Sequence, residues 1–275
     1  MKNEIHDDVE RLKIIYEGKG EGRAPFWSRD VWGPLIPEIQ FGEGQFRDLV
    51  IDELRSHGFQ TSDMARLSAI ELGCGWGRNL HLFLELGIPA RNIAGVDLIE
   101  DFIAFGQSQN PSLNIAAGDA TRTSFPDGAF DIVLLHTVLS AILDRDIQSK
   151  LLVEARRLVK PGGLVFVFDV ADHYPIGRTE VSGEQLAFIE PIPRLTLCAI
   201  AADAGLTMAG WRRSGLMPRP RKLVFRGVFS TIAARLGRSL SSPRNFAFRL
   251  ALARLLSLLP RANSHYFITF VPDPA

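Results

Sequence analysis

Three glycines alternate with other residues in the segment Glu71-Leu-Gly73-Cys-Gly75-Trp-Gly77, which follows a short apolar run and opens a helical pattern. Glycine lets a backbone approach a ligand closely, and the first turn of a helix presents N–H groups without partners. A dinucleotide-binding loop of the GxGxxG kind would need glycine at position 78, where this chain has Arg78. The spacing GxGxG therefore argues against NAD and favours a ligand without a pyrophosphate.

Acidic residues lie at the ends of three consecutive apolar runs. Glu71 lies in the first, Asp97 ends the second and Asp119 ends the third. A carboxylate at the second position can accept bonds from both hydroxyls of a ribose, and one at the third can accept from an adenine amino group. Glu71 is costly to bury without a partner, which a cationic ligand provides. Taken singly, Asp97 could be a helix N-cap and Asp119 a turn residue; together the three carboxylates predict a cationic adenosyl ligand.

Seven short apolar runs alternate with segments of helical periodicity, and we expect each run to be a strand of one sheet. Repeated strand–helix units of this length favour a parallel sheet with helices on both faces. The expected strands are 68–72, 92–98, 113–119, 130–136, 164–170, 206–214 and 264–271. The expected helices are 7–17, 46–57, 79–86, 101–108, 147–159 and 195–204, with two further helical stretches within 216–262.

Four segments resemble, in the same order, motifs one to four and the helix between the last two in class I methyltransferases that depend on S-adenosylmethionine (SAM). They are IELGCGWGRNL, GVDL, GDATRTSFPDGAFDIV and EARRLVKPGGLVFVFD, and they cover roughly residues 66–172. The resemblance implies an α/β chain with the Rossmann-like methyltransferase fold, in which a mostly parallel seven-stranded sheet carries helices on both faces. It also implies SAM as cofactor, S-adenosylhomocysteine as product, and no metal.

The resemblance assigns roles to the residues of these motifs. The glycines of the first motif are expected to line the methionine part of SAM. Glu71 is expected to support its amino group, Asp97 the ribose and Asp119 the adenine. The full set expected at the cofactor is Glu71, Gly73, Cys74, Gly75, Gly77, Asn79, Asp97, Leu98, Gly118, Asp119, Ala120, His136 and Thr137.

A narrower resemblance concerns the acceptor. HTVLSAILD, the FDV that ends the fifth strand and the terminal LLSLLPRANSHYF look like a subgroup often found in bacterial polysaccharide gene clusters. Members of that subgroup usually continue after the fifth strand with an Asn- and Pro-rich segment, whereas this chain has ADHYPIGRTE. The narrower resemblance implies a glycan-type acceptor.

Three histidines lie at strand ends that should face the cofactor. His136 ends the fourth strand, His173 follows the fifth, and His265 begins the last, which runs antiparallel in the resembled fold. Histidine is suited to accept a proton from a hydroxyl near neutral pH. We therefore expect His173 or His136, and after them His265, as general base, with Asp169 and Tyr174 as secondary candidates. A solvent-facing or capping histidine is the alternative for each, and an amine acceptor needs no base.

The chain is expected to have four parts. These are an N-terminal helical and aromatic cap segment (1–45), a SAM-binding core (46–215), a basic helical insert (216–262) and the last core strand (263–275). The insert is expected to leave and re-enter the sheet at the cofactor edge, so it is predicted to cap the substrate opening. The aromatic residues Phe26, Trp27 and Trp32 are expected either to form the opposite wall or to clasp the domain.

The formal net charge is zero, but residues 204–272 carry twelve basic side chains and no Asp or Glu. Such asymmetry can indicate an anionic partner. The basic residues of 216–262 are open to three interpretations: a solvated helix face, contact with an anionic substrate, or peripheral docking on an anionic membrane. We expect no nucleic-acid partner, because the chain has no nucleic-acid-reading motif.

Two cysteines, Cys74 and Cys198, form no CxxC or Cys/His cluster, which argues against a disulfide framework and a zinc site. The chain has no uncharged apolar stretch of membrane-spanning length and no apolar segment at its start, so we expect a cytoplasmic protein. The prediction is a SAM-dependent methyltransferase acting on a small-molecule or saccharide acceptor, through a hydroxyl. The alternatives are an N-methyltransferase of a secondary metabolite and a non-catalytic SAM-binding protein acting through its basic insert.

Overall fold

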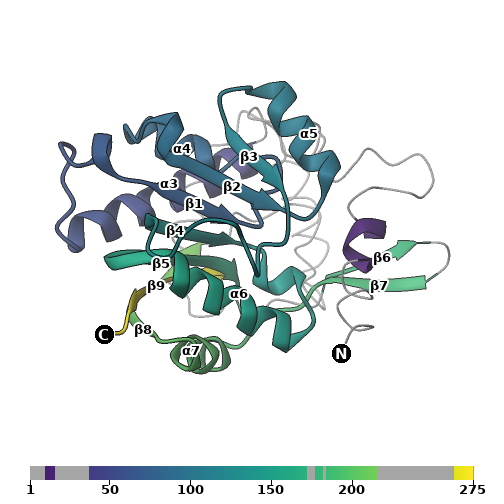
Figure 1. Cartoon of the computed structure of the whole chain (residues 1–275). Helices are drawn as coiled ribbons and strands as arrows, with labels where there is room; N and C mark the ends of the chain where they lie inside the picture. The colour runs from purple at the N-terminus through teal and green to yellow at the C-terminus, as the bar shows by residue number, and fades with distance from the viewer. Residues whose placement is uncertain (1–9, 16–36, 172–176, 182–183, 216–262, 275) are drawn as a thin grey trace, which may run out of the picture.

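Seven strands form one sheet in the order β3-β2-β1-β4-β5-β9-β8 (Figure 1). The computed structural model describes residues 10–15, 37–171, 177–181, 184–215 and 263–274. The strands are β1 (Ala69–Leu72), β2 (Ile93–Asp97), β3 (Asn114–Ala117), β4 (Phe130–His136), β5 (Val159–Val170), β8 (Leu206–Gly215) and β9 (Asn263–Pro272). Strands β1 to β5 pair in parallel, and β9 pairs antiparallel with both β5 and β8. The predicted seven-stranded, mostly parallel sheet is confirmed.

Helices cover both faces of this sheet (Figure 1). One face carries α3 (Pro37–Ser56), α4 (Leu80–Glu85) and α5 (Glu100–Gln109), and the other carries α6 (Arg145–Leu158) and α7 (Arg194–Asp203). Apolar side chains from alternate strand positions form a buried cluster under each layer. Strands covered on both faces need continuous apolar runs, which explains why β4 reads as FDIVLLH.

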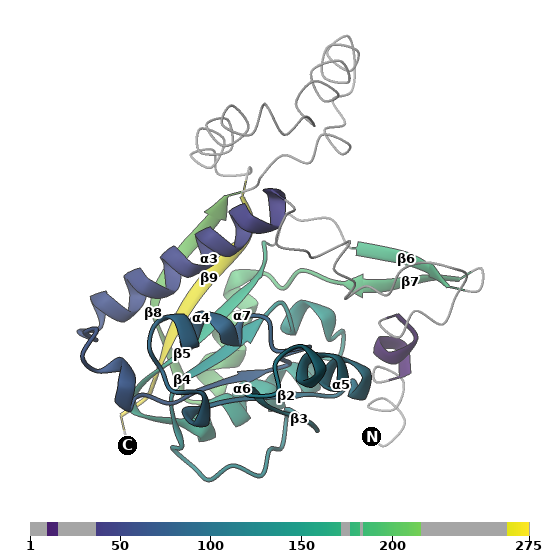
Figure 2. The ribbon, with the colours of Figure 1, turned by 90° about the horizontal axis from the view of Figure 1, so that it is seen from above.

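Local signals explain where some of the helices begin. Asp144 caps α6, because its side chain accepts hydrogen bonds from the N–H groups of Asp146 and Ile147 at 2.7 and 3.3 Å. The buried face of α6 consists mainly of Leu151, Leu152, Ala155 and Leu158, as the helical spacing predicts. Helix α3 runs alongside β8 and β9 (Figure 2) and begins at Pro37 rather than at Phe46 as predicted. The predicted boundary between 1–45 and the core therefore falls inside this helix.

A two-stranded hairpin was missed by the sequence analysis. Strands β6 (Gly177–Val181) and β7 (Glu184–Ile189) pair antiparallel, apart from the main sheet. Charged residues in β6 interrupt the apolar alternation by which a strand is recognised. The hairpin follows β5, so it lies on the side of the molecule where the parallel strands end (Figure 2).

The two segments predicted to cap the site fall outside the described residues. These are most of 1–45, including the aromatic residues at 26, 27 and 32, and the whole of 216–262. Residues 10–15 are helical, in agreement with part of the helix expected over 7–17. Gly215 at the end of β8 pairs with Asn263 at the start of β9. The chain therefore leaves and re-enters the sheet at one place, at the edge where the parallel strands end.

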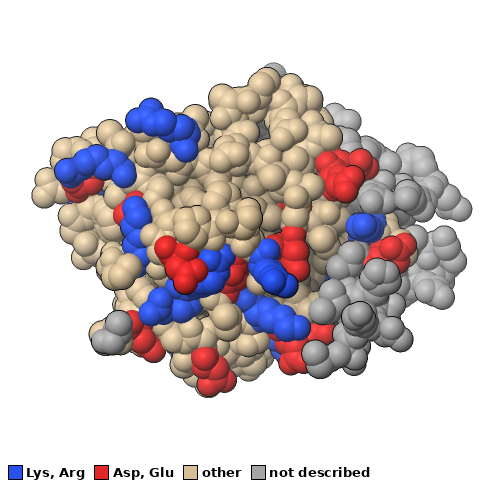
Figure 3. Space-filling view, viewed as in Figure 1, with Lys and Arg blue, Asp and Glu red and all other residues tan. Residues whose placement is uncertain are grey.

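Basic and acidic side chains are interspersed on the face of the molecule seen in Figure 3. Ten of the twelve basic residues of the 204–272 region lie within 216–262, so the charge asymmetry of the sequence belongs mainly to a segment outside the described residues. Among the helices that the structure describes, none is both long enough and apolar enough to cross a bilayer.

Candidate active site

The glycine-rich loop connects the end of β1 to α4 and turns back toward β2. Gly73, Gly75 and Gly77 all have positive φ angles, of 76°, 53° and 80°. The N–H groups of Gly73 and Cys74 both donate to the carbonyl oxygen of Val96, at 2.8 and 3.1 Å. Residues with a Cβ rarely adopt such φ angles, so this loop conformation requires glycine.

The three glycines differ in what surrounds them. A Cβ at Gly73 would lie 2.4 Å from the Val138 side chain, and one at Gly77 would lie 3.1 Å from Leu113. A Cβ at Gly75 would meet only Phe102, at 3.9 Å. Packing therefore excludes a side chain at the first glycine and leaves little room for one at the third, whereas the second faces space that a ligand can use.

Glu71 lies near the end of β1 with its side chain fully buried. Its Oε1 accepts a hydrogen bond of 2.7 Å from Nδ2 of Asn79, the residue before α4. Its Oε2 is buried and has no hydrogen-bond partner among the described residues. Burial raises the pKa of this carboxyl to about 8, and the bond from Asn79 opposes the shift. A buried oxygen of this kind is costly without a partner, so it suits a cationic or hydrogen-bond-donating ligand.

Asp97 ends β2 and braces the glycine loop. Its Oδ2 accepts from the N–H of Gly75 at 2.7 Å, and its Oδ1 accepts from the N–H of Ile99 at 2.9 Å. Burial raises the pKa of this carboxyl, while the two backbone bonds oppose the rise. The N-cap alternative does not apply, because α5 begins at Glu100 and is preceded by Ile99. Each carboxylate oxygen keeps a further lone pair, so Asp97 can still accept from two hydroxyl groups.

Asp119 follows β3 and is exposed. Its Oδ1 accepts from both the N–H and the hydroxyl of Thr121, at 2.8 and 2.7 Å, which is the turn role considered as its alternative. Gly118 and Ala120 on either side are half-buried, as is Leu98 after β2. Strands β1, β2 and β3 are adjacent in the sheet, so these positions lie along one edge. The adenine role of Asp119 stays a prediction.

Arg78 is a site residue that the sequence analysis used only to exclude a dinucleotide loop. Its Nε lies 3.0 Å from Oε1 of Glu43 on α3, with the two side chains 26% and 37% exposed. Burial lowers the pKa of Arg78, and the carboxylates of Glu43 and Glu71 oppose that shift. The sequence contains no local signal for this contact, because it joins residues from two elements that meet only in the folded chain.

A row of stacked rings crosses β4, β5 and β9 on the sheet face covered by α3. The Phe168 ring lies between the imidazoles of His136 and His265, with centroid distances of 4.7 and 5.0 Å and interplanar angles of 19° and 13°. Phe46 of α3 meets His136 edge-on at 4.8 Å. Two of the three histidines predicted at the site are therefore brought together, whereas His173, like Tyr174, lies outside the described residues.

Both stacked imidazoles are held in the neutral form. Burial lowers the pKa of His136 to about 3, and the positive charge of Arg78 acts in the same direction. Burial lowers the pKa of His265 to about 4. Both pKa shifts have the same cause, because burial removes the water that would stabilise a charged imidazole. Either ring can accept a proton at neutral pH, but only as a weak base.

The segment after β4 connects this row to the glycine loop. Thr137 is the one residue other than glycine with a positive φ, 52°, in the described part of the chain. Its N–H donates to the carbonyl oxygen of Phe168 at 2.7 Å, and the next residue, Val138, packs on Gly73. Asp169 is buried and accepts from the N–H of Ser140 at 3.0 Å, and burial raises its pKa to about 6. The positive φ of Thr137 is backbone strain, and such strain often marks functional sites.

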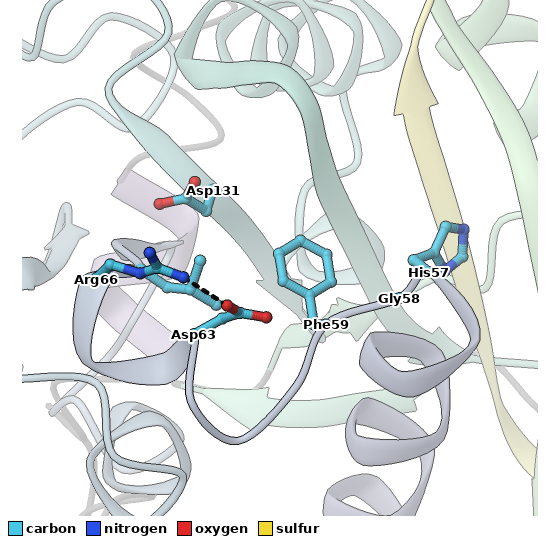
Figure 4. A pocket seen from close by; sticks show the side chains of 7 residues that line it. His57, Gly58, Phe59, Asp63, Arg66 and Asp131 are labelled. Atoms are coloured by element: carbon cyan, nitrogen blue, oxygen red, sulfur yellow. Dashed lines mark hydrogen bonds and ion pairs between the residues drawn. The ribbon is translucent and has the colours of Figure 1, made fainter.

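An open surface hollow lies elsewhere, where the parallel strands begin. His57, Phe59, Asp63, Arg66 and Asp131 line it, together with Gly58 and Leu67 (Figure 4). Its charged groups are paired: Arg66 donates to Asp63 at 2.6 Å, and Asp131 is bonded to neighbouring residues. Within the described segments, no three His, Cys, Asp or Glu side chains are grouped so as to hold a metal ion.

Comparison with known proteins gives one family match. Residues 70–167 match the family model described as a methyltransferase domain. Arsenite methyltransferase from Aquipseudomonas alcaligenes is 26% identical over 161 residues, which are 53% of this chain and 42% of that protein. Thiol S-methyltransferase TMT1B from Homo sapiens is 29% identical over 120 residues, which are 42% of this chain and 47% of that protein. The chain thus spans less than half the length of these curated relatives.

A solved structure shows the same fold. A SAM-dependent methyltransferase from Archaeoglobus fulgidus superposes with a TM-score of 0.51 at 20% identity, covering 84% of this chain and 98% of that one. The likeness supports the arrangement of sheet and helices described above.

Proposed function

Because residues 70–167 form a methyltransferase domain of the class I, SAM-dependent type, we propose that this protein transfers a methyl group from SAM to a hydroxyl of a small molecule. The observation that carries the proposal is the buried Oε2 of Glu71, which has no hydrogen-bond partner among the described residues. The ammonium of an amino acid is the partner that this oxygen needs.

The residues around Glu71 fit an adenosyl amino acid. The open space at Gly75 lets a ligand approach the backbone of the loop. Asp97 has lone pairs that can accept hydrogen bonds from the two ribose hydroxyls. The adenine ring would be surrounded by Leu98, Gly118, Asp119 and Ala120. His136 and Thr137 would lie beside the methionine end, because Val138 packs directly on Gly73 of the same loop.

SAM supplies a methyl group on a sulfonium that is already activated, so the protein has to align the acceptor and receive its proton. The row of His136, Phe168 and His265 lies on the same sheet face as Glu71. We place the acceptor beside the end of this row that α3 leaves partly exposed, with His136 as proton acceptor because it is the nearer of the two imidazoles to the glycine loop. His173 remains a second candidate.

The weak basicity of the two imidazoles bears on the acceptor class. A general base assists most when its pKa lies near the working pH. Burial lowers the pKa of His136 to about 3 and that of His265 to about 4, so these weak bases favour a hydroxyl that ionises readily, such as a phenol or an enol. They suit a sugar hydroxyl less well, so we favour a phenolic or enolic acceptor over the saccharide. An arsenite acceptor has little support, because Cys74 is buried and Cys198 lies on the opposite side of the sheet.

Mass-spectrometric detection of S-adenosylhomocysteine tests this function. The full chain is incubated with SAM and a panel of phenols, enols, sugars and amines. We expect product with a phenol or enol, and for His136→Gln a loss of about 10²-fold in kcat/KM, the lower end of the range for a general base, that exceeds any loss of SAM affinity. Turnover of amines alone would indicate N-methylation, and SAM binding without any product would indicate a binding protein.

We also propose two roles for residues 216–262, covering the acceptor and docking on a membrane. If this segment caps the acceptor, its deletion should change turnover or acceptor choice while SAM still binds. If it docks on anionic membrane, Arg→Glu changes within it should abolish binding to vesicles containing phosphatidylserine, since each basic residue near such a surface contributes about 1 kcal/mol. A cytoplasmic location is likewise a prediction.

A further inference from the structure

Thr137 follows β4 with a backbone conformation that a residue with a Cβ rarely adopts. Its φ is 52°, and every other positive φ in the described part of the chain belongs to a glycine. Such a conformation persists only where the surrounding structure holds it. The groups that hold Thr137, and the group that its side chain then contacts, indicate what the strained conformation does.

Two hydrogen bonds to β5 hold the segment that begins at Thr137. The N–H of Thr137 donates to the carbonyl oxygen of Phe168 at 2.7 Å. Three residues later, the N–H of Ser140 donates to Oδ2 of Asp169 at 3.0 Å, and both of these residues are buried. The other oxygen of Asp169 accepts from the N–H of Val170 at 2.8 Å. The carboxylate therefore ties the segment to the end of β5.

In this conformation the side chain of Thr137 contacts the neighbouring histidine. Its Oγ1 lies 3.3 Å from Nδ1 of His136. A neutral imidazole carries its proton on one nitrogen and accepts on the other, and the partner of one nitrogen decides which. A hydroxyl that accepts from Nδ1–H leaves Nε2 without a proton, which is the form that a general base needs. Phe168, stacked on the ring at 4.7 Å, restricts its plane but does not select this form.

We propose that Thr137 is a positioning residue, whose hydroxyl keeps the proton of His136 on Nδ1, and that Asp169 holds Thr137 in place for this contact. The inference rests on the proposed function, in which His136 is the general base. The proton of the acceptor hydroxyl goes to Nε2, its oxygen bonds to the methyl carbon, and the electrons of the broken bond stay on the sulfur. Asp169 thus supports the base and is not itself the base.

Two substitutions at Thr137 test the role of its hydroxyl. Thr137→Val removes the hydroxyl and keeps the branched shape, whereas Thr137→Ser keeps the hydroxyl. The full chain is assayed for S-adenosylhomocysteine formed with a phenol, and its affinity for S-adenosylhomocysteine is measured by calorimetry. Thr137→Val should lower kcat about 2- to 10-fold, the effect of losing one hydrogen bond, with a smaller change in affinity. Thr137→Ser should keep a kcat close to that of the wild type.

The position of the proton on His136 is measured by ¹⁵N NMR of the full chain labelled in histidine. The chain has six histidines, and His136→Gln identifies the signal of this one. The wild type should show the form protonated on Nδ1, and Thr137→Val should move the ring toward the form protonated on Nε2. A wild-type ring protonated on Nε2 overturns the proposal, because that nitrogen could not accept a proton.

Asp169→Asn tests the support of the segment, because an amide can accept only one of the two N–H groups. It should lower kcat about 2- to 10-fold. Asp131→Asn is the matched control, since this carboxylate also accepts from a backbone N–H, that of Ser68 at 2.8 Å, at the edge where the strands begin. The control should destabilise the fold and leave kcat unchanged.

Three results would contradict the roles of Thr137 and Asp169. They are a wild-type kcat in Thr137→Val, an equal loss in Thr137→Val and Thr137→Ser, and an equal loss of kcat in Asp169→Asn and Asp131→Asn. If Thr137→Val does not fold, Thr137→Ala removes the same hydroxyl. A wild-type chain that forms no product contradicts the proposed function instead, and the NMR measurement still tests the contact between Thr137 and His136 because it needs no turnover.

Discussion

The two edges of the sheet differ in how the hydrogen-bonding needs of their acidic side chains are satisfied. Where the parallel strands begin, Asp131 accepts from the N–H and hydroxyl of Ser68 and from Nζ of Lys160, all at 2.8 Å. Where they end, the Oε2 of Glu71 is buried without a hydrogen-bond partner among the described residues. The edge where the strands begin has a surface hollow, and the edge where they end has a buried oxygen without a hydrogen-bond partner among the described residues. The candidate site is therefore identified by this oxygen and not by the hollow.

Backbone strain separates the same two edges. Where the parallel strands end, Thr137 has a positive φ of 52° and is the one residue other than glycine to do so in the described part of the chain. Where they begin, positive φ angles belong to glycines such as Gly162, at 79°, where a Cβ would meet nothing within 4 Å. Glycine adopts such angles without strain, whereas a strained residue with a Cβ is typical of functional sites.

The largest expected effect comes from Gly73→Ala. The new Cβ would be strained by its positive φ and would lie 2.4 Å from the Val138 side chain. We expect a loss of about 2–5 kcal/mol in the free energy of unfolding, from both causes together, and no measurable S-adenosylhomocysteine binding. Gly162→Ala at the other edge should cost only about 1–2 kcal/mol and leave binding unchanged. Chemical denaturation measures the two losses of stability, and calorimetry measures binding by the two variants. If Gly73→Ala and Gly162→Ala lost the same free energy of unfolding, the distinction between the two edges would be wrong.

Gly75→Ala should separate binding from stability. Its Cβ would have only Phe102 nearby, at 3.9 Å, so the free energy of unfolding should fall by about 1–2 kcal/mol, as for Gly162→Ala. S-adenosylhomocysteine should bind at least about tenfold more weakly, because the methyl group occupies space assigned to the ligand. A variant that binds as well as the wild type would show that no ligand approaches Gly75.

In contrast to Gly75→Ala, Asp131→Asn should lower the stability of the fold without weakening ligand binding. The change leaves Lys160 without its carboxylate partner at 2.8 Å, and we expect a loss of about 1–3 kcal/mol in the free energy of unfolding. The affinity for S-adenosylhomocysteine should not change, because the residue lies at the edge where the strands begin. Weaker binding at constant stability would place the ligand near the hollow of Figure 4 instead.

The smallest effect expected is a proton released on binding. The pKa of Glu71 is raised to about 8, so its contribution to folding stability is complete below the ordinary carboxyl range and is lost as the pH rises through about 8. At pH 7 the carboxyl is mostly protonated and must ionise to pair with an ammonium. Titrations in buffers of different ionisation enthalpy should therefore report close to one proton released. Glu71→Gln should abolish the buffer dependence.

The arrangement of the strands could be predicted from the sequence because its causes are local. Apolar runs and glycine turns each leave a signal a few residues long, and parallel strand–helix units then place Glu71 and Asp97 at one edge. The start of α3 and the β6–β7 hairpin were missed because their local signals are weak. Pro37 to Gln45 has little helical periodicity, and charged residues interrupt β6.

Contacts across the fold could not be predicted. The pair of Arg78 and Glu43 joins a loop to a helix, and the stack of His136 on Phe168 joins two strands. The sequence predicted three histidines at the site, among them His136 and His265, but not that a phenylalanine separates the rings of these two. The weak basicity of these imidazoles follows from that packing, which is why the sequence predicted a small-molecule or saccharide hydroxyl but could not favour a phenol or enol over a sugar.

The most direct test of the carboxyl-edge site is a calorimetric titration with S-adenosylhomocysteine, run in parallel on the wild type and on Glu71→Gln. The account predicts one binding site per wild-type chain and an affinity about 10- to 100-fold lower in the variant, since one charged partner is lost. The variant should be at least as stable as the wild type at pH 7, because its amide is neutral without taking up a proton. Equal affinities, or no binding by the wild type, would contradict it.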